Sequence, residues 1–99
     1  MMQTETTFTA EDTVVAIPDQ VSTDLDGEAV ILSLRDSTYY GLNEVGALVW
    51  RLIQTPISVR AICAAILEEY EVEAAQCERD VLALLGDLAA NSLIEVKLP

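Results

Sequence analysis

The chain has 99 residues, of which 52% are hydrophobic, and its 17 acidic and five basic side chains give a net charge of −12. This length predicts one domain with a small core, and the acidity argues against nucleic-acid binding, because phosphate backbones repel an acidic surface. No apolar run is long enough to span a membrane and the polar start does not resemble a signal peptide, so we expect a cytoplasmic protein without a membrane partner.

The N-terminal end is predicted to lie outside the folded domain. Residues 1–12 are polar and acidic, as is typical of a flexible tail, and residues 13–97 are expected to form the domain. An extended segment is predicted over residues 13–17 and ends at Pro18. Residues 1–28 hold seven acids and no Lys or Arg, which either steers a basic partner segment or only keeps the surface solvated.

Three strands are predicted next. Residues 21–25 and 28–34 alternate apolar and polar side chains, and Asp26-Gly27 between them is a strong hairpin signal. After a second turn, the sequence favours a short strand over residues 38–42. We therefore expect a meander of three antiparallel strands, with the last strand short.

Helical spacing of apolar residues follows. Three helices are predicted over residues 44–54, 58–70 and 74–90. Asn43 and Ser58 suit the N-caps of the first two, and Asn91 suits a left-handed stop after the third. Residues 93–96 are expected to return as a short strand or an extended tail.

Strands followed by helices indicate an α+β fold, in which helices cover one face of a small sheet. We expect a winged helix-turn-helix-like architecture, with a three-stranded antiparallel sheet followed by a three-helix bundle.

The side chains that catalysis usually requires are missing. There is no histidine, the commonest general base and transition-metal ligand, so a Ser-His-Asp triad is excluded. Cys63 and Cys77 do not form a CxxC pair, which argues against a zinc site and favours buried free thiols. The acidic run over residues 68–73 is more typical of a solvated surface. We therefore expect neither an enzyme nor a protein with a cofactor.

The short strand over residues 38–42 is predicted to lie at the edge of the sheet. An edge strand offers unpaired backbone N–H and C=O groups, and no Lys, Pro or inward charge protects this one. An extended peptide could add there as a further strand. Tyr39 and Tyr40 point to opposite faces, so one is expected to enter the core while the other lines a groove. The alternative is that both tyrosines pack and the N-terminal tail covers the edge.

From Val21 to Ile94 the chain resembles the PqqD-like family, also called RiPP recognition elements. The shared features are the Asp26-Gly27 turn, the strand over residues 30–34, Tyr39-Tyr40-Gly41-Leu42-Asn43, Gly46, Trp50, Asp80-Val81-x-x-Leu84-Leu85 and Leu93-Ile94. Their order and spacing carry the resemblance. The Tyr-Tyr-Gly-Leu-Asn run with its downstream Trp is most similar to the stand-alone recognition proteins of lasso-peptide systems.

The resemblance implies that the chain binds the leader segment of a ribosomally made precursor peptide, as a strand added between the edge strand and the third helix. The residues it assigns to binding are Thr38, Tyr39, Tyr40 and Gly41 on the strand and Cys77, Asp80, Val81 and Leu84 on the helix. It implies no catalytic residue. Instead, the chain would deliver the precursor to a cysteine leader peptidase, which acts with an ATP-dependent cyclase.

Alternatives stay open at this point. Val81 and Leu84 are equally consistent with plain core positions, and the alternative for Asp80, which the sequence favours less, is solvated helix surface. Within the same family, the chain could instead be a peptide chaperone that presents a precursor to a radical-SAM maturase. A winged-helix transcription factor and a small enzyme are rivals from other classes, against which the acidic charge and the missing histidine argue.

Overall fold

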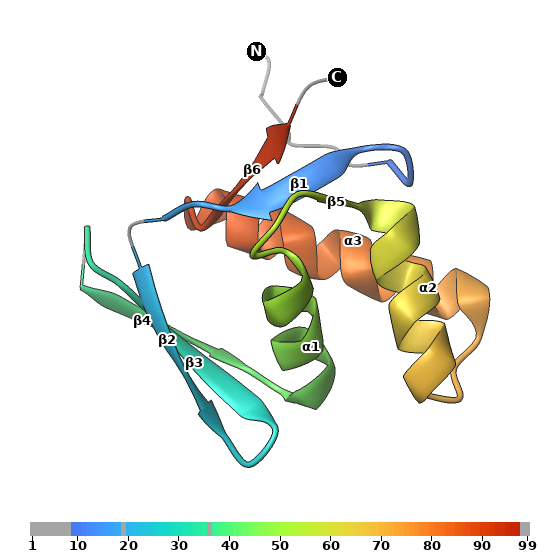
Figure 1. Ribbon diagram of the computed structural model, residues 1–99, viewed down its shortest axis with the longest axis horizontal. Coiled ribbons are helices and arrows are strands. Elements are labelled where there is room, and N and C mark those ends of the chain that lie inside the picture. Colours follow the sequence, from blue (N-terminus) through green and yellow to red (C-terminus); the bar gives the residue numbers. More distant parts are fainter. Residues whose placement is uncertain (1–8, 19, 36, 98–99) are drawn as a thin grey trace.

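The computed structural model describes residues 9–18, 20–35 and 37–97. In chain order its elements are β1 (Thr13–Ala16), β2 (Gln20–Leu25), β3 (Glu28–Ser33), β4 (Thr38–Leu42), α1 (Glu44–Leu52), β5 (Ile57–Ser58), α2 (Val59–Glu69), α3 (Ala74–Ala90) and β6 (Ile94–Lys97). Figure 1 shows β2, β3 and β4 as one sheet beside the helices, and β1, β5 and β6 as a second, smaller sheet. The predicted α+β fold, with a three-stranded antiparallel sheet and three helices, is confirmed. No helix in the described ranges is long and apolar enough to cross a membrane.

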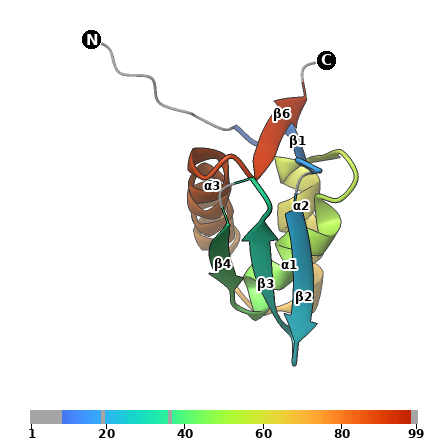
Figure 2. The ribbon, with the colours of Figure 1, turned by 90° about the vertical axis from the view of Figure 1, so that its left-hand side faces the viewer.

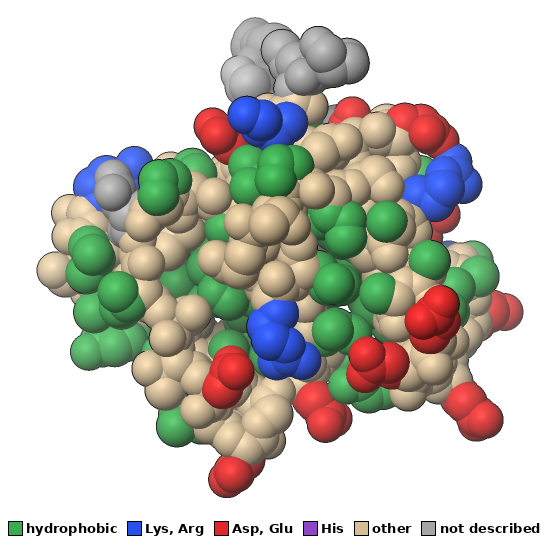
Figure 3. All heavy atoms as spheres, in the orientation of Figure 1, with side chains coloured by type: hydrophobic (Ala, Val, Ile, Leu, Met, Phe, Trp, Pro, Cys, Tyr) green, Lys and Arg blue, Asp and Glu red, His purple; other side chains and the backbone are tan. Residues whose placement is uncertain are grey.

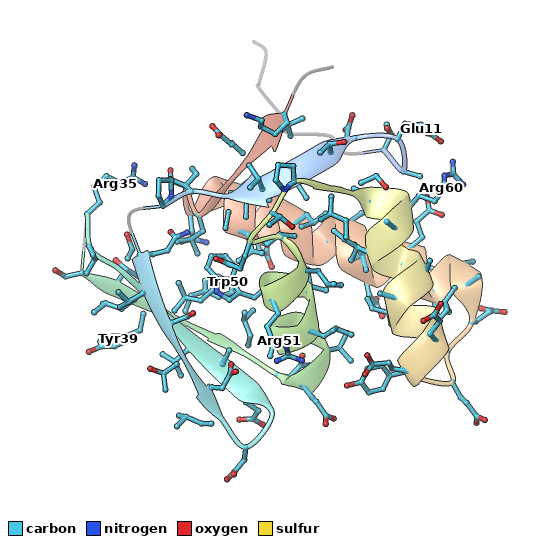
Figure 4. All side chains as sticks on the ribbon, viewed as in Figure 1. Glu11, Arg35, Tyr39, Trp50, Arg51 and Arg60 are labelled. Carbon is cyan, nitrogen blue, oxygen red and sulfur yellow. The ribbon has the colours of Figure 1, made fainter. Side chains whose placement is uncertain are left out.

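The predicted flexible tail falls mostly outside the described residues, as does Asp36 of the second turn. The part of the tail that is described lies against the start of α2. The carbonyl of Asp12 accepts a hydrogen bond from the Val59 amide at 2.9 Å. Glu11 forms an ion pair with Arg60, which Figure 4 shows beside it. A flexible tail over residues 1–8 stays a prediction.

The main sheet is the predicted meander, with strand order β2-β3-β4 and antiparallel pairing throughout. Asp26 and Gly27 both have positive φ, at 54° and 87°, which is the backbone conformation of a tight two-residue hairpin turn. The register places Val21, Leu32 and Tyr39 in one row across the three strands. This hairpin therefore forms where its local turn signal predicts it.

The two faces of this sheet differ. Ala29, Ile31 and Ser33 of β3 are buried, and α1 packs against this strand. Val30 and Leu32 alternate with them and therefore point to the opposite face, which we call the outer face. Figure 2 looks onto the outer face and shows no helix in front of it. The hydrophobic core thus lies between one face of the sheet and the helices.

The helix ends follow local signals closely. The side chains of Asn43 and Ser58 accept hydrogen bonds, at 2.9 and 3.1 Å, from backbone N–H groups three residues further on, which confirms both predicted N-caps. The third helix spans its predicted range. Asn91 has a φ of −96°, however, and the left-handed residue is Ser92, with a φ of 60°. The predicted left-handed stop at Asn91 is therefore wrong by one position.

The second sheet, with strand order β5-β1-β6, was not predicted as a sheet. Residues 13–17 and 93–96 were expected to be extended, and the structure pairs them as β1 and β6. Val14 of β1 lies opposite Ile57 on one side and Val96 on the other, and its side chain is fully buried. Because these strands are short and come from opposite ends of the domain, no local pattern indicates that they pair.

Candidate peptide-binding groove

The β4 strand forms one edge of the main sheet. In the part of the chain that the structure describes, β4 pairs only with β3. Residues 9–18 reach the second sheet instead, so the described N-terminal segment does not cover this edge. Figure 2 shows β4 as the strand on the α3 side of the sheet. An edge in this position offers backbone hydrogen-bonding groups next to a helix.

A cavity of about 570 Å³ lies beside this edge. Its walls come from β4, the start of α1, the end of α2 and α3. On α3 the lining side chains Cys77, Val81 and Leu84 recur at helical spacing and so share one face of the helix. Cys77 and Val81 are buried, whereas Leu84 is half-buried. We call this cavity, together with the β4 edge, the groove.

The structure brings most of the predicted site residues together here. The predicted residues that line the cavity are Tyr40, Gly41, Cys77, Asp80, Val81 and Leu84. Thr38 and Tyr39 do not line it. The Tyr39 side chain is 71% exposed on the outer face, and Figure 4 shows it pointing away from the helices. The Tyr39 side chain therefore lies outside the cavity, and a peptide bound along the edge could meet it only on the outer face.

The predicted division of roles between the two tyrosines is wrong. Tyr40 alone packs against the core and also lines the cavity. Its partner in the register is Ile31, a buried residue of β3, which places the Tyr40 ring on the helix side of the sheet. Tyr39 lies opposite Leu32 and so on the outer face. The register between β3 and β4, rather than any property of the two tyrosines, decides which ring enters the core.

The groove is apolar with an acidic rim. Burial, and then the negative charge of Asp87 on α3, raise the pKa of the Tyr40 hydroxyl above its usual value. The Asp80 carboxylate is exposed and accepts a hydrogen bond from the Gln76 side chain at 2.8 Å. Among the described residues that line the cavity there is no Lys or Arg. This combination suits a ligand with an apolar side chain and a neighbouring basic or donor group.

Several lining residues escaped the sequence analysis. They are Leu42, Asn43, Val45, Gly46, Val49, Ile66 and Val72. Leu42, Asn43 and Gly46 carry the family resemblance in the sequence, but the resemblance assigns them no binding role. Val72 lies between Glu71 and Glu73 in a segment interpreted as solvated surface, yet it is an apolar side chain, 46% exposed, at the cavity. An apolar residue inside an acidic run is the signal that could have revealed it.

The two cysteines lie close together but show no sign of reactivity. Both thiols are free, and the Cys77 thiol lies 3.9 Å from the carbonyl oxygen of Cys63. Burial, reinforced by the neighbouring Cys77 and by Glu78, raises the pKa of Cys63 to about 11. A thiol with this pKa stays protonated at neutral pH, which makes it a poor nucleophile. Among the described residues no group of His, Cys, Asp or Glu side chains could hold a metal ion.

Slow alkylation of Cys63 is the expected consequence. A rise of the pKa to about 11 lowers the thiolate population at pH 8 by about 100-fold, and the greater nucleophilicity of a more basic thiolate recovers only about tenfold of this. Iodoacetamide should therefore modify native Cys63 at least about tenfold more slowly than the unfolded chain. Time-resolved mass spectrometry with and without guanidinium measures both rates. Equal rates would contradict this account of Cys63.

Comparison with known proteins identifies a family and two similar solved structures. Residues 28–94 match the family model described as coenzyme PQQ synthesis protein D (PqqD). A solved structure described as "TbiB1 in Complex with the TbiA(beta) Leader Peptide" is similar, with a TM-score of 0.77 and 34% identity over 86% of this chain and 99% of that chain. Another, "Lasso peptide synthetase B1 complexed with the leader peptide", has a TM-score of 0.72 and 29% identity over 87% and 98%. No curated protein matches the sequence.

Proposed function

The chain belongs to the PqqD family, and from this premise we propose that it binds the leader segment of a ribosomally made precursor peptide in lasso-peptide maturation. The leader adds as a strand to the edge of β4 and lies in the groove. The chain then presents the precursor to a separate cysteine leader peptidase. An ATP-dependent cyclase is a further partner of this complex.

The observation that carries the proposal is that the open edge and the cavity coincide. Tyr40 and Gly41 belong to the edge strand and also line the cavity. A strand added at this edge gains main-chain hydrogen bonds, and every second side chain of that strand points toward the cavity. The same place therefore supplies affinity through the backbone and specificity through side chains. Both similar structures are described as complexes with leader peptides.

The chemistry of the groove defines the leader that it suits. Val45 and Val49 on α1 line the same cavity as Val81 and Leu84 on α3, so the cavity suits an apolar leader side chain. Asp80 at the cavity suits a basic side chain or a hydrogen-bond donor next to that anchor. Specificity then rests on a few anchor residues of the leader.

Delivery needs no catalytic residue in this chain. A leader held in the groove keeps the rest of the precursor tethered nearby, and tethering of this kind raises the local concentration to about the millimolar range. The enzyme that docks beside the groove then meets its substrate at that concentration. We place this step in the cytoplasm, where the precursor is made.

Fluorescence polarisation tests the proposal. A labelled leader peptide from the precursor of the same genome is titrated with the purified chain, and a scrambled leader serves as the control. We expect saturable binding that scrambling abolishes. Absence of binding at about 10 μM, equivalent to a binding free energy weaker than about 7 kcal/mol, would contradict leader recognition by this chain alone. Co-purification then separates the pathways. In lasso-peptide maturation a cysteine peptidase co-purifies with the chain, whereas in the alternative pathway the co-purifying enzyme is an iron–sulfur protein, the radical-SAM maturase.

A further inference from the structure

The outer face of the main sheet is apolar and uncovered in the described structure. Its apolar residues are Val21 and Leu25 of β2, Val30 and Leu32 of β3, and Tyr39 of β4, and the register places Thr23 and Glu28 on the same face toward the hairpin. Val21 is 52% exposed, Leu25 is 56% exposed and Tyr39 is 71% exposed. The helices all lie on the other side of this sheet, as Figures 1 and 2 show. An antiparallel sheet that meets water normally presents polar residues on that face, so this one requires an explanation.

The exposed apolar side chains concentrate at this sheet. Of the six large hydrophobic residues that are exposed in the described structure, three belong to the outer face, and a fourth, Leu34, follows β3 directly. In Figure 3 hydrophobic side chains gather at the left margin, over the main sheet. A patch of this kind marks an interaction site more often than isolated apolar residues do.

The charges around the outer face indicate what chemistry its partner has. The β2–β3 hairpin at one end carries Asp26 in its turn and Glu28 on the outer face itself, whereas Asp24 points to the other face of the sheet. Arg35 lies beyond the other end of β3 and donates a hydrogen bond to the Ser92 carbonyl at 3.1 Å. A complementary surface therefore has an apolar centre and basic side chains opposite the hairpin. A second copy of this chain is a poor match, since each copy carries a net charge of −12.

The area of the outer face also argues for a partner that extends beyond it. Three strands of five or six residues present roughly 250 Å² in projection, from about 3.3 Å per residue and about 4.8 Å between strands. A stable interface buries about 800 Å² on each partner. A leader strand on β4 would widen the same sheet, and its outward side chains would lie beside Tyr39 and Gly41. A partner seated on the outer face would therefore touch the leader as well.

We propose that the outer face is the docking surface for the enzyme that processes the bound precursor, a protein whose matching surface is apolar and edged with basic side chains. This inference rests on the proposed function, because it assigns to that enzyme a contact with the leader strand. Docking and leader binding then reinforce each other, since the enzyme's contact area is complete only when the leader is present.

The test uses two neighbouring residues of β2 that point to opposite faces. Val21→Lys changes the outer face, and Ser22→Lys is its matched control, with the same added charge at an exposed residue on the other face of the same strand. Both residues lie two strands away from the β4 edge, so both variants should bind labelled leader peptide like the wild type. Thermal unfolding by circular dichroism confirms that each variant folds.

Binding of the cysteine leader peptidase from the same genome is then measured by calorimetry, with and without the leader peptide. We expect Val21→Lys to weaken peptidase binding by about tenfold or more, Ser22→Lys to leave it unchanged, and the leader to tighten it in the wild type.

Equal peptidase binding by the two variants, or no peptidase binding by a wild type that binds leader, would overturn the docking surface and leave the proposed function standing. Failure of the wild-type chain to bind the leader peptide would overturn the proposed function itself. A wild-type dimer in sedimentation velocity that Val21→Lys makes monomeric would show that a second copy occupies this face instead.

Discussion

Truncation of Leu84 to alanine is expected to weaken leader binding by about tenfold or more while the fold survives. Leu84 lines the cavity from α3 and is half-buried, so its side chain is available to a ligand. Removing it leaves an anchor side chain of the leader without its apolar partner. The free energy of unfolding should fall by less than the roughly 2–5 kcal/mol that is lost when a fully buried leucine is replaced by alanine. Tyr40→Ala, on the strand side of the groove, should act in the same direction.

Two leucines provide matched controls for this experiment. Leu67 of α2 is 39% exposed and does not line the cavity, so Leu67→Ala should leave leader binding unchanged. Leu85 is fully buried in the core, and Leu85→Ala should lower the free energy of unfolding by about 3 kcal/mol. Polarisation gives the affinity and urea unfolding gives the stability of each variant. If the binding loss of Leu84→Ala merely tracks its stability loss, as for Leu85→Ala, the proposed groove is wrong.

Local signals in the sequence predicted the elements that frame the groove. Asp26-Gly27 specifies its turn because both residues tolerate positive φ, and Asn43 and Ser58 specify helix starts because their side chains reach backbone N–H groups nearby. Each of these effects acts over a few residues. The main sheet and the helices were therefore predictable without knowledge of the tertiary structure.

Features that depend on tertiary packing were not predictable in the same way. Nothing in the sequence of two adjacent tyrosines shows which one faces the helices, because the pairing of Tyr40 with Ile31 decides it. The α1 side of the cavity was missed for a similar reason. Val45 and Val49 have the spacing of any core-facing helix, and only the position of α3 leaves a cavity beside them.

The second sheet also depends on tertiary packing, because its strands lie far apart in the sequence. Its central strand, β1, connects to the ends of the two helices that line most of the groove. The Ala16 amide donates to the Ile53 carbonyl, just after α1, at 2.8 Å. The Ile17 amide donates to the Leu93 carbonyl, just after α3, at 2.9 Å. We therefore expect β1 to be essential to the domain, although the family match begins only at residue 28.

Val14→Asp tests this role of β1. The Val14 side chain has no exposed area, so the substitution places a carboxylate in the core, where an unpaired charge costs about 4 kcal/mol or more. A domain of this size has a total stability of about 5–10 kcal/mol, so we expect most of its stability to be lost. Thr13→Asp is the control, because Thr13 is only half-buried, and it should cost less than about 1 kcal/mol.

Urea unfolding followed by tryptophan fluorescence measures both variants, since Trp50 on α1 is buried and reports loss of the core. A large effect of Val14→Asp beside a small effect of Thr13→Asp would mean that the groove depends on a strand remote from it in sequence. The two helices would then be held at their ends by β1, and the cavity between them would owe its shape to that contact. Equal stability of both variants would instead mean that the main sheet and the helices hold the groove without the second sheet.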